Sequence, residues 1–215
     1  MKKRSGKTAR ATPRAAVRHT QVRTAQSRGH VVFLVGFMGA GKSSVGRALA
    51  GRLNWRFEDL DDRIERHQGR RVAEIFRDSG ESEFRQAERS ALAAVLGELR
   101  AGTARIVALG GGAFVDKQNA GLLKEAGVPV VFLDAPVEEL WERCCAQAAE
   151  EKTERPLLRS REQFAKLYDE RREKYRKATL RVRTGSRTVD AIAAEIEQAL
   201  GLRKIRTRNE EGEFE

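Results

Sequence analysis

Residues Val31–Ser43 have the sequence VVFLVGFMGAGKS, which is the most informative segment of the chain. Its first five residues, Val31–Val35, are wholly apolar and rich in β-branched side chains, which is typical of a strand buried on both faces. The strand leads directly into Gly36–Ser43, which fits the pattern GxxxxGK[ST] and is followed by a helical pattern. In such a loop the glycines let backbone N–H groups point at phosphate oxygens, and the next helix adds its positive end. We therefore predict a phosphate-binding loop.

The loop predicts a bound nucleotide but not the reaction, and eliminating other classes of P-loop protein leaves a small-molecule kinase that uses ATP. We expect Lys42 to reach the β- and γ-phosphates and the Ser43 hydroxyl to ligate Mg²⁺. A GTPase would also carry an NKxD-like motif and an ABC ATPase an LSGGQ-like segment, and the chain has neither in a suitable context. Its 215 residues are few for a motor or an unfoldase. The residues that we expect to bind the ATP phosphates are Gly39, Ala40, Gly41, Lys42, Ser43 and Ser44.

The rest of the chain alternates apolar runs with helical patterns, which predicts an α/β fold with a parallel sheet covered by helices on both faces. Ligands bind beyond the carboxyl ends of the strands in such sheets. Glycines lie where several helices should stop. Besides 31–35, the predicted strands are 55–57, 105–109, 129–133 and 180–183. The predicted helices are 42–53, 61–67, 72–78, 82–100, 120–125, 137–148, 161–178 and 188–200.

A second group must help to hold the metal, and two candidates compete. Asp134 ends an apolar run, but Ala135-Pro136 follows it and a cap for the next helix explains it. Asp59 and Asp61 follow the second predicted strand, and their alternation points both carboxylates to one side of the strand end. We favour this pair.

The formal net charge of +11 is concentrated at the N-terminus. Residues 1–29 hold nine basic residues and no acidic one, so the remainder carries 42 − 9 = 33 basic against 31 acidic residues, a net of +2. We expect 1–29 to be a disordered arm, 30–202 to be one domain and 203–215 to be a charged tail. The arm has three open readings: an organelle transit peptide, a nucleic-acid tether, or a solvated tail with no assigned role.

Two other features narrow the class of protein. No apolar run approaches the roughly 20 residues that span a bilayer, so we expect no membrane insertion. The adjacent Cys144 and Cys145 form no disulfide framework and have no metal-ligand partners nearby, which predicts a reducing compartment.

The motifs together resemble the shikimate kinase family over nearly all of the domain. The resemblance lies in GFMGAGKSSVGRALA at 36–50, DLDDRIE at 59–65, EIFRDSGESEFRQAE at 74–88, ALGGGAFV at 108–115, RPLL at 155–158 and LYDERREKY at 167–175. It implies a P-loop kinase fold of the nucleoside monophosphate kinase type, with five parallel strands in the order 2-3-1-4-5. It also implies transfer of the ATP γ-phosphate to the 3-hydroxyl of shikimate.

The resemblance assigns roles to single residues. Arg85 and Arg171 would grip the shikimate carboxylate, which suits the planar guanidinium fork, and Glu88 would orient Arg85. Asp61 would bind the acceptor hydroxyls and take the proton, while Asp59 would hold Mg²⁺ through water. Further substrate contacts would come from Gly110, Gly111 and Gly112.

The same resemblance predicts a lid at about 146–160. Arg155 on this lid would reach the transferring phosphate, and Arg143 would flank the adenine. The catalytic set is then Lys42, Asp61 and Arg155. The segment from Arg143 to Arg155 is longer than the family pattern, which leaves the geometry of the lid open.

Two other functions remain as alternatives. One is another small-molecule P-loop kinase such as a gluconate kinase, because gluconate also carries a carboxylate. The other is a nucleic-acid-binding or regulatory P-loop protein that uses the arm, although the domain offers no helix-turn-helix, zinc or aromatic-stacking motif. We expect a cytoplasmic monomer whose partners are ATP and shikimate, with neither a membrane nor nucleic acid.

Overall fold

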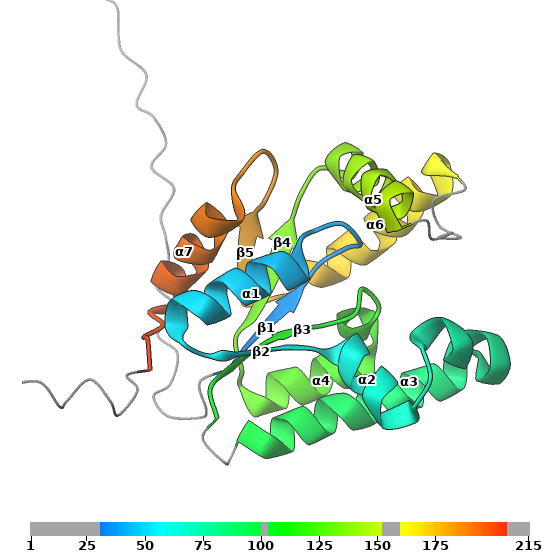
Figure 1. Cartoon of the computed structure of the whole chain (residues 1–215), viewed down its shortest axis with the longest axis horizontal. Helices are drawn as coiled ribbons and strands as arrows, with labels where there is room; N and C mark the ends of the chain where they lie inside the picture. Colours follow the sequence, from blue (N-terminus) through cyan, green and yellow to red (C-terminus); the bar gives the residue numbers. More distant parts are fainter. Residues whose placement is uncertain (1–30, 100–102, 152–159, 206–215) are drawn as a thin grey trace, which may run out of the picture.

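The computed structural model describes residues 31–99, 103–151 and 160–205, and its centre is a five-stranded parallel sheet (Figure 1). The strand order is β2-β3-β1-β4-β5, and all four strand pairs run parallel. This confirms the predicted fold class and strand order. The strands are β1 (Val31–Val35), β2 (Arg56–Asp59), β3 (Arg105–Ala108), β4 (Val130–Asp134) and β5 (Leu180–Arg183).

Helices cover both faces of the sheet. Figure 1 shows α1 and α7 side by side on one face and α3 and α4 together on the other. The helices are α1 (Lys42–Leu53), α2 (Leu60–Gln68), α3 (Val72–Glu98), α4 (Lys117–Ala126), α5 (Val137–Glu151), α6 (Arg161–Tyr175) and α7 (Val189–Leu200), with a short 3₁₀ helix, η2 (Ala113–Val115), before α4. Among the described residues, no helix is both long and apolar enough to cross a lipid bilayer.

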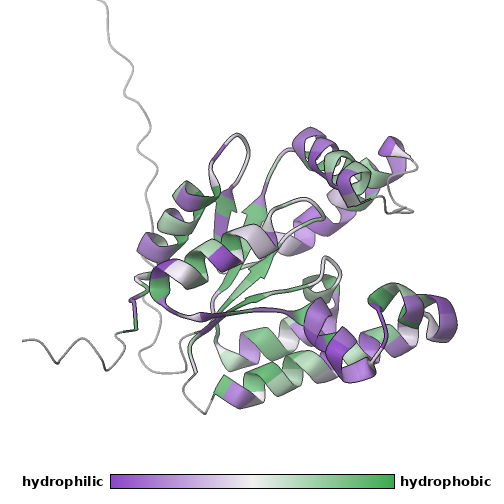
Figure 2. Cartoon of the chain, viewed as in Figure 1, coloured by the Kyte–Doolittle hydropathy of each residue, from purple (hydrophilic) through white to green (hydrophobic). Residues whose placement is uncertain are grey.

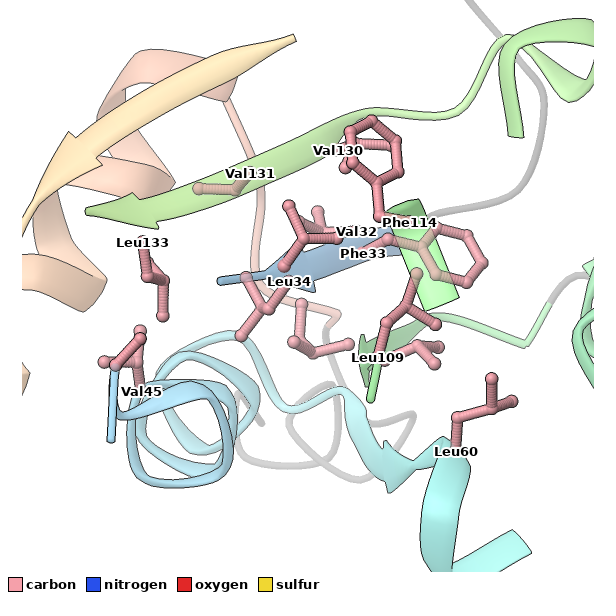
Figure 3. Close-up of a cluster of buried hydrophobic side chains, with 14 of the residues drawn as sticks. Val32, Phe33, Leu34, Val45, Leu60, Leu109, Phe114, Val130, Val131 and Leu133 are labelled. Carbon is pink, nitrogen blue, oxygen red and sulfur yellow. The ribbon is translucent and has the colours of Figure 1, made fainter. Parts of the chain in front are cut away.

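The core forms around β1, the central strand. Every residue of β1 is buried, as its unbroken apolar sequence predicts for a strand covered on both faces. Figure 3 shows Phe33 and Leu34 of β1 among side chains from β4, from the helices around the sheet and from Leu109, which directly follows β3. Burying one such side chain completely contributes about 1.5–3 kcal/mol. Figure 2 shows the same division, with apolar central strands and a strongly polar α2.

The least apolar strand, β2, extends further toward the C-terminus than the sequence predicted. It was predicted over 55–57 and extends to Asp59, because an edge strand accepts polar side chains that a central strand would not. This extension places Asp59 both at the carboxyl end of β2 and at the N-cap of α2.

Caps and glycines set the helix ends. Gly69 and Gly127 end α2 and α4 in the left-handed conformation. Gly80 (φ 81°, ψ 175°) breaks α3 where a stop was predicted. The start of α4 was predicted three residues late, because Asp116 caps this helix by accepting hydrogen bonds from the backbone N–H groups of Gln118 and Asn119.

The chain after α7 returns to the turn between α1 and β2. The indole N–H of Trp55 donates to the Arg203 carbonyl oxygen (3.2 Å), and the Ile205 N–H donates to that of Leu53 (3.0 Å). Two residues of the predicted tail, Arg203 and Ile205, are therefore hydrogen-bonded to the domain, although both are exposed. The tail after Ile205 and the predicted basic arm lie outside the described residues.

Candidate active site

The phosphate loop joins β1 to α1 at the carboxyl end of the sheet. Gly41 caps α1 with a φ of 85°, a conformation that strains any residue with a side chain. The Lys42 ammonium donates to the carbonyl oxygens of Gly36 (3.1 Å) and Phe37 (3.2 Å), so it folds back over the loop. Burial lowers the pKa of Lys42, and the Asp61 carboxylate opposes part of that effect. An ammonium group held in this way is positioned for phosphate oxygens.

Asp59 connects the end of β2 to the phosphate loop. Its Oδ2 accepts a hydrogen bond from the Ser43 hydroxyl (2.9 Å), and its Oδ1 accepts one from the backbone N–H of Asp61 (3.1 Å). A hydroxyl and a carboxylate side by side at a phosphate loop fit Mg²⁺, which prefers oxygen ligands and usually completes its shell with water and nucleotide phosphates. Within the described part of the chain, no cluster of three or more His, Cys, Asp or Glu could hold a metal by itself.

The competing carboxylate, Asp134, has a structural role instead. Its buried carboxylate accepts hydrogen bonds from Arg172 on α6 (3.3 Å) and Arg181 on β5 (2.7 Å), and from the Tyr168 hydroxyl (3.4 Å). Burial alone would raise its pKa, but the two guanidinium groups hold it below the usual range. The interpretation of Asp134 as a helix cap was therefore wrong, because the carboxylate holds α6 and β5 to β4.

Three consecutive glycines, Gly110, Gly111 and Gly112, follow β3 and form one surface of the region where we expect the phosphate acceptor. We call this surface the glycine floor. Each glycine lies against a different charged side chain. A Cβ added at Gly110 would lie 2.8 Å from Asp61 Oδ1, and one at Gly111 would lie 3.3 Å from an Arg171 nitrogen. A Cβ at Gly112 would lie 2.6 Å from both terminal nitrogens of Arg85. The absence of side chains at these positions is what lets the three charged groups approach.

Asp61 lies in the first turn of α2, facing Gly110. Its Oδ1 is buried and has no hydrogen-bond partner in the described structure. Burial, followed by repulsion from Asp59, raises the pKa of Asp61 to about 6. The pair therefore contains one carboxylate that holds the phosphate loop and one that is free to accept a hydrogen bond.

Arg85 lies in α3 after the break at Gly80. Its guanidinium donates to Glu88 Oε2 (2.9 Å) and to Glu81 Oε1 (3.1 and 3.3 Å). Glu88 is fully buried, whereas the Glu81 side chain is 69% exposed. Burial raises the pKa of Glu88, which the hydrogen bond from Arg85 partly offsets. Glu88 thus contacts Arg85 directly, as its predicted role in orienting this arginine requires.

Arg171 approaches the same floor from α6. Its guanidinium carbon lies 5.8 Å from the centre of the Phe37 ring, so a residue of the phosphate loop supports it. Four residues on, the buried Tyr175 donates its hydroxyl to the Gly111 carbonyl oxygen. Burial raises the pKa of Tyr175 to about 12, so it acts as a neutral donor that fixes α6 against the glycines.

A cavity of about 470 Å³ extends from the phosphate loop toward α5 and α7. Arg143 lines it and donates to Glu139 Oε2 (2.9 Å) and the Thr184 carbonyl oxygen (3.3 Å). The predicted loop residues, including Ser44, line its other wall. This cavity has the position required for the base and sugar of a nucleotide whose phosphates occupy the loop.

One predicted catalytic residue, Arg155, lies outside the described residues. The first part of the predicted lid, up to Glu151, belongs to α5. The role of this segment stays a prediction.

Comparison with known proteins identifies the family of this chain. The sequence model of the family described as shikimate kinase matches residues 38–201. A shikimate kinase from Geobacter metallireducens is 45% identical over 168 residues, which cover 77% of this chain and 88% of the relative. The chain belongs to the shikimate kinase family.

Solved structures distinguish this family from the wider fold. A shikimate kinase from Acinetobacter baumannii, solved in complex with shikimate, matches with 34% identity and a TM-score of 0.67, over 83% of this chain and 96% of the other. A gluconokinase from Sinorhizobium meliloti matches at 21% identity and a TM-score of 0.50, over 81% and 92% of the two chains, and shares the fold alone. The comparisons support a kinase of the shikimate kinase family and give no support to the nucleic-acid alternative.

Sequence reasoning missed several residues of this shikimate kinase site. Thr184 and Arg187 line the nucleotide cavity but stand in a β5–α7 connection with no motif of its own. Asn119 donates to Glu88, 31 residues earlier in the chain. The only local sequence signal near Asn119 is Asp116, which caps α4 and lies shortly after the three glycines. This cap indicates where α4 starts, but it does not indicate which residue Asn119 contacts.

Proposed function

We propose that this protein transfers the γ-phosphate of ATP to the 3-hydroxyl of shikimate, giving shikimate 3-phosphate and ADP. The observation that carries the proposal is the floor of three glycines, against which one carboxylate and two guanidinium groups converge beside a phosphate loop. Shikimate has matching groups, since it carries one carboxylate and three hydroxyls. The relative solved with shikimate supports the same substrate.

In this proposal, the acceptor binds between α2, α3 and α6. Arg85 and Arg171 bind the carboxylate, because two guanidinium forks can each offer paired N–H donors to its oxygens. Asp61 accepts hydrogen bonds from the acceptor hydroxyls. Backbone N–H groups of Gly110, Gly111 and Gly112 offer further donors at a floor that no side chain covers.

Phosphoryl transfer then follows from position and charge. The 3-hydroxyl oxygen forms the new bond to the γ-phosphorus while the bond to the β–γ bridging oxygen breaks, and ADP leaves with that electron pair. Asp61 accepts the hydroxyl proton, for which it is suited because a carboxyl with a pKa of about 6 is mostly ionised at neutral pH. Lys42 holds the β- and γ-phosphate oxygens, and Arg155 adds positive charge to the transferring group.

The donor side completes the proposal. Mg²⁺, held by Ser43 and Asp59, would neutralise charge on the β- and γ-phosphates. Backbone groups of the loop from Gly39 to Ser44 bind the phosphates, and Arg143 flanks the base. We further propose that the protein acts as a monomer in a reducing cytoplasm; neither Cys144 nor Cys145 forms a disulfide, which fits such a compartment.

The test is an assay of ADP release with full-length protein and Mg²⁺-ATP, offered shikimate, gluconate or adenylate as the acceptor. We expect rapid release with shikimate and little with the other two. A protein lacking residues 1–29 should show the same preference, because the proposed site contains no residue of that segment. Absence of shikimate-dependent ADP release would contradict the proposal, and faster release with gluconate would assign the site to another acceptor.

A further inference from the structure

Asn119 is a fully buried polar residue that the mechanism above does not use. It lies in the first turn of α4, and none of its surface is exposed. Its side-chain N–H donates to Glu88 Oε2 (3.3 Å), while its own Oδ1 is buried without a partner in the described structure. Burying an amide that satisfies only part of its hydrogen-bonding capacity costs free energy. Fold stability alone would favour an apolar side chain at this position.

The contact made by Asn119 continues to the acceptor side of the site. The atom that receives its hydrogen bond, Glu88 Oε2, also accepts the hydrogen bond from Arg85. Glu88 is held between two donors, one on its own helix and one on α4. Removing the donor on α4 would leave the carboxylate free to turn about its side-chain torsions, and the Arg85 guanidinium would turn with it.

Backbone hydrogen bonds fix the position of Asn119 relative to the glycines. The segment from Gly110 to Asn119 is continuous through η2, and Asp116 fixes the start of α4 by accepting from the N–H of Asn119. This segment therefore constrains Arg85 from two sides. Gly112 limits the guanidinium directly, because any Cβ there would lie 2.6 Å from its nitrogens, and Asn119 acts through Glu88.

We propose that Asn119 is a positioning residue for the acceptor carboxylate, acting through Glu88 to hold the Arg85 guanidinium at the glycine floor. The proposal rests on the proposed function, because it assigns Arg85 to the carboxylate of shikimate. It adds a residue from α4 to a site otherwise formed by the phosphate loop, α2, α3 and α6. Its role is confined to acceptor binding, since its described hydrogen bonds lead to Glu88 and Asp116 and not to the nucleotide cavity.

The test is Asn119→Leu, which keeps the branched shape of the side chain and removes the donor. We expect the KM for shikimate to rise about tenfold, which corresponds to the loss of one charge-assisted hydrogen bond. The KM for ATP and kcat should stay within about twofold, and the melting temperature should not fall. The matched control is Gln118→Leu on the exposed side of the same turn, which should change neither KM.

A double-mutant cycle with Glu88→Gln separates positioning from general disturbance. In the Glu88→Gln background, Asn119→Leu should change the shikimate KM by less than about twofold, because the charge it positions is already gone. If Asn119→Leu does not fold, Asn119→Ala takes its place in the same cycle. An unchanged shikimate KM, an equal rise in both KM values, or two independent effects that multiply would overturn the proposal. Wild-type activity on shikimate is measured beside them, so failure of the proposed function itself would be visible separately.

Discussion

The protein contains two clusters of charged side chains that differ in how completely the chain pairs them. In the first, the structural cluster, Arg63 and Arg105 are buried, whereas the Glu98 side chain is 42% exposed. In the structural cluster, Arg63 and Arg105 bind Glu58 and Glu98 across β2, β3, α2 and α3, with Arg63–Glu58 at 2.9 Å and Arg105–Glu98 at 2.6 Å. These hydrogen bonds lower the pKa of Glu98 to about 2. In the catalytic cluster, burial raises the pKa of Asp61 to about 6 and lowers that of Lys42.

This difference in pairing indicates a different role for each cluster. In the structural cluster, each charge meets an opposite charge from the chain, and the hydrogen bonds from Arg63 and Arg105 lower the pKa of Glu98, which favours its ionised form. The catalytic cluster contains Asp61 and Lys42, whose charges the chain does not fully pair. The pKa of each therefore shifts in the direction that favours its neutral form. Phosphate and carboxylate groups of the ligands would supply the missing partners. The first cluster should therefore contribute to stability and the second to binding and rate.

The largest expected effect comes from the catalytic cluster. Lys42→Met should lower kcat by about 10²–10³-fold, because it removes a fixed positive charge from the developing charge on the phosphates. The free energy of unfolding should stay close to that of the wild type. Steady-state ADP release checks the rate, and urea unfolding checks the stability. Lys124→Met, on the exposed face of α4, is the control and should leave kcat unchanged.

The structural cluster should give the opposite profile. Arg63→Met should lower the free energy of unfolding by about 2–3 kcal/mol, because it leaves Glu58 short of a partner while Arg63 itself is 8% exposed. The KM values of the folded enzyme should stay within about twofold. Urea unfolding and kinetics at a temperature well below the transition measure the two quantities. A stable Arg63→Met protein with impaired kcat would remove the distinction between the clusters.

A smaller and more selective effect is expected at the glycine floor. Gly112→Ala should raise the shikimate KM about tenfold by displacing the Arg85 guanidinium, while the ATP KM changes little. Backbone strain should be small, because φ at Gly112 is −95°. Gly97→Ala is the matched control, since a Cβ there meets nothing within 4 Å. Equal increases in both KM values after Gly112→Ala would show that this floor does not serve the acceptor alone.

The smallest effect is a pH-dependent change in stability at Glu88. Its pKa is raised in the folded protein, so its charge destabilises the fold above that pKa, and the penalty disappears as the pH falls toward the ordinary value. Glu88→Gln should therefore raise the free energy of unfolding at pH 7 by up to about 1 kcal/mol. The gain over the wild type should shrink as the pH falls to about 4.5. A variant that is less stable at pH 7 would mean that the pair with Arg85 outweighs the burial of the charge.

The parts of the fold and site that sequence could predict are those with a local signal. The strand, loop and helix around Lys42 form one continuous pattern, and Asp59 was correctly expected at the end of the second strand. Strand alternation does not place Asp61, because this residue lies in the first turn of α2. The paired charges could not be predicted in the same way. Arg105 lies 47 residues from Glu58, and Asp134 meets Arg181 at the same separation, so only the register of the parallel strands brings them together.

Contacts between residues that are distant in the sequence also limited the prediction of the site. Arg85 could be assigned through its motif, but its two constraints, Gly112 and Asn119, come from a segment after β3 whose approach to α3 depends on tertiary packing. The Asp134 error has a related cause. A carboxylate before a helix usually caps it, and the arginines that bind this one come from elements 38 and 47 residues later in the chain.

The most direct test of the central claim is the pair of KM values for Arg85→Ala, measured beside the wild type by ADP release with shikimate and Mg²⁺-ATP. We expect a rise of at least about tenfold in the shikimate KM, with the ATP KM within about twofold, because in the proposed site Arg85 binds the acceptor and not the nucleotide. Equal increases in the two KM values, or an unchanged shikimate KM, would contradict the placement of the acceptor carboxylate at the glycine floor.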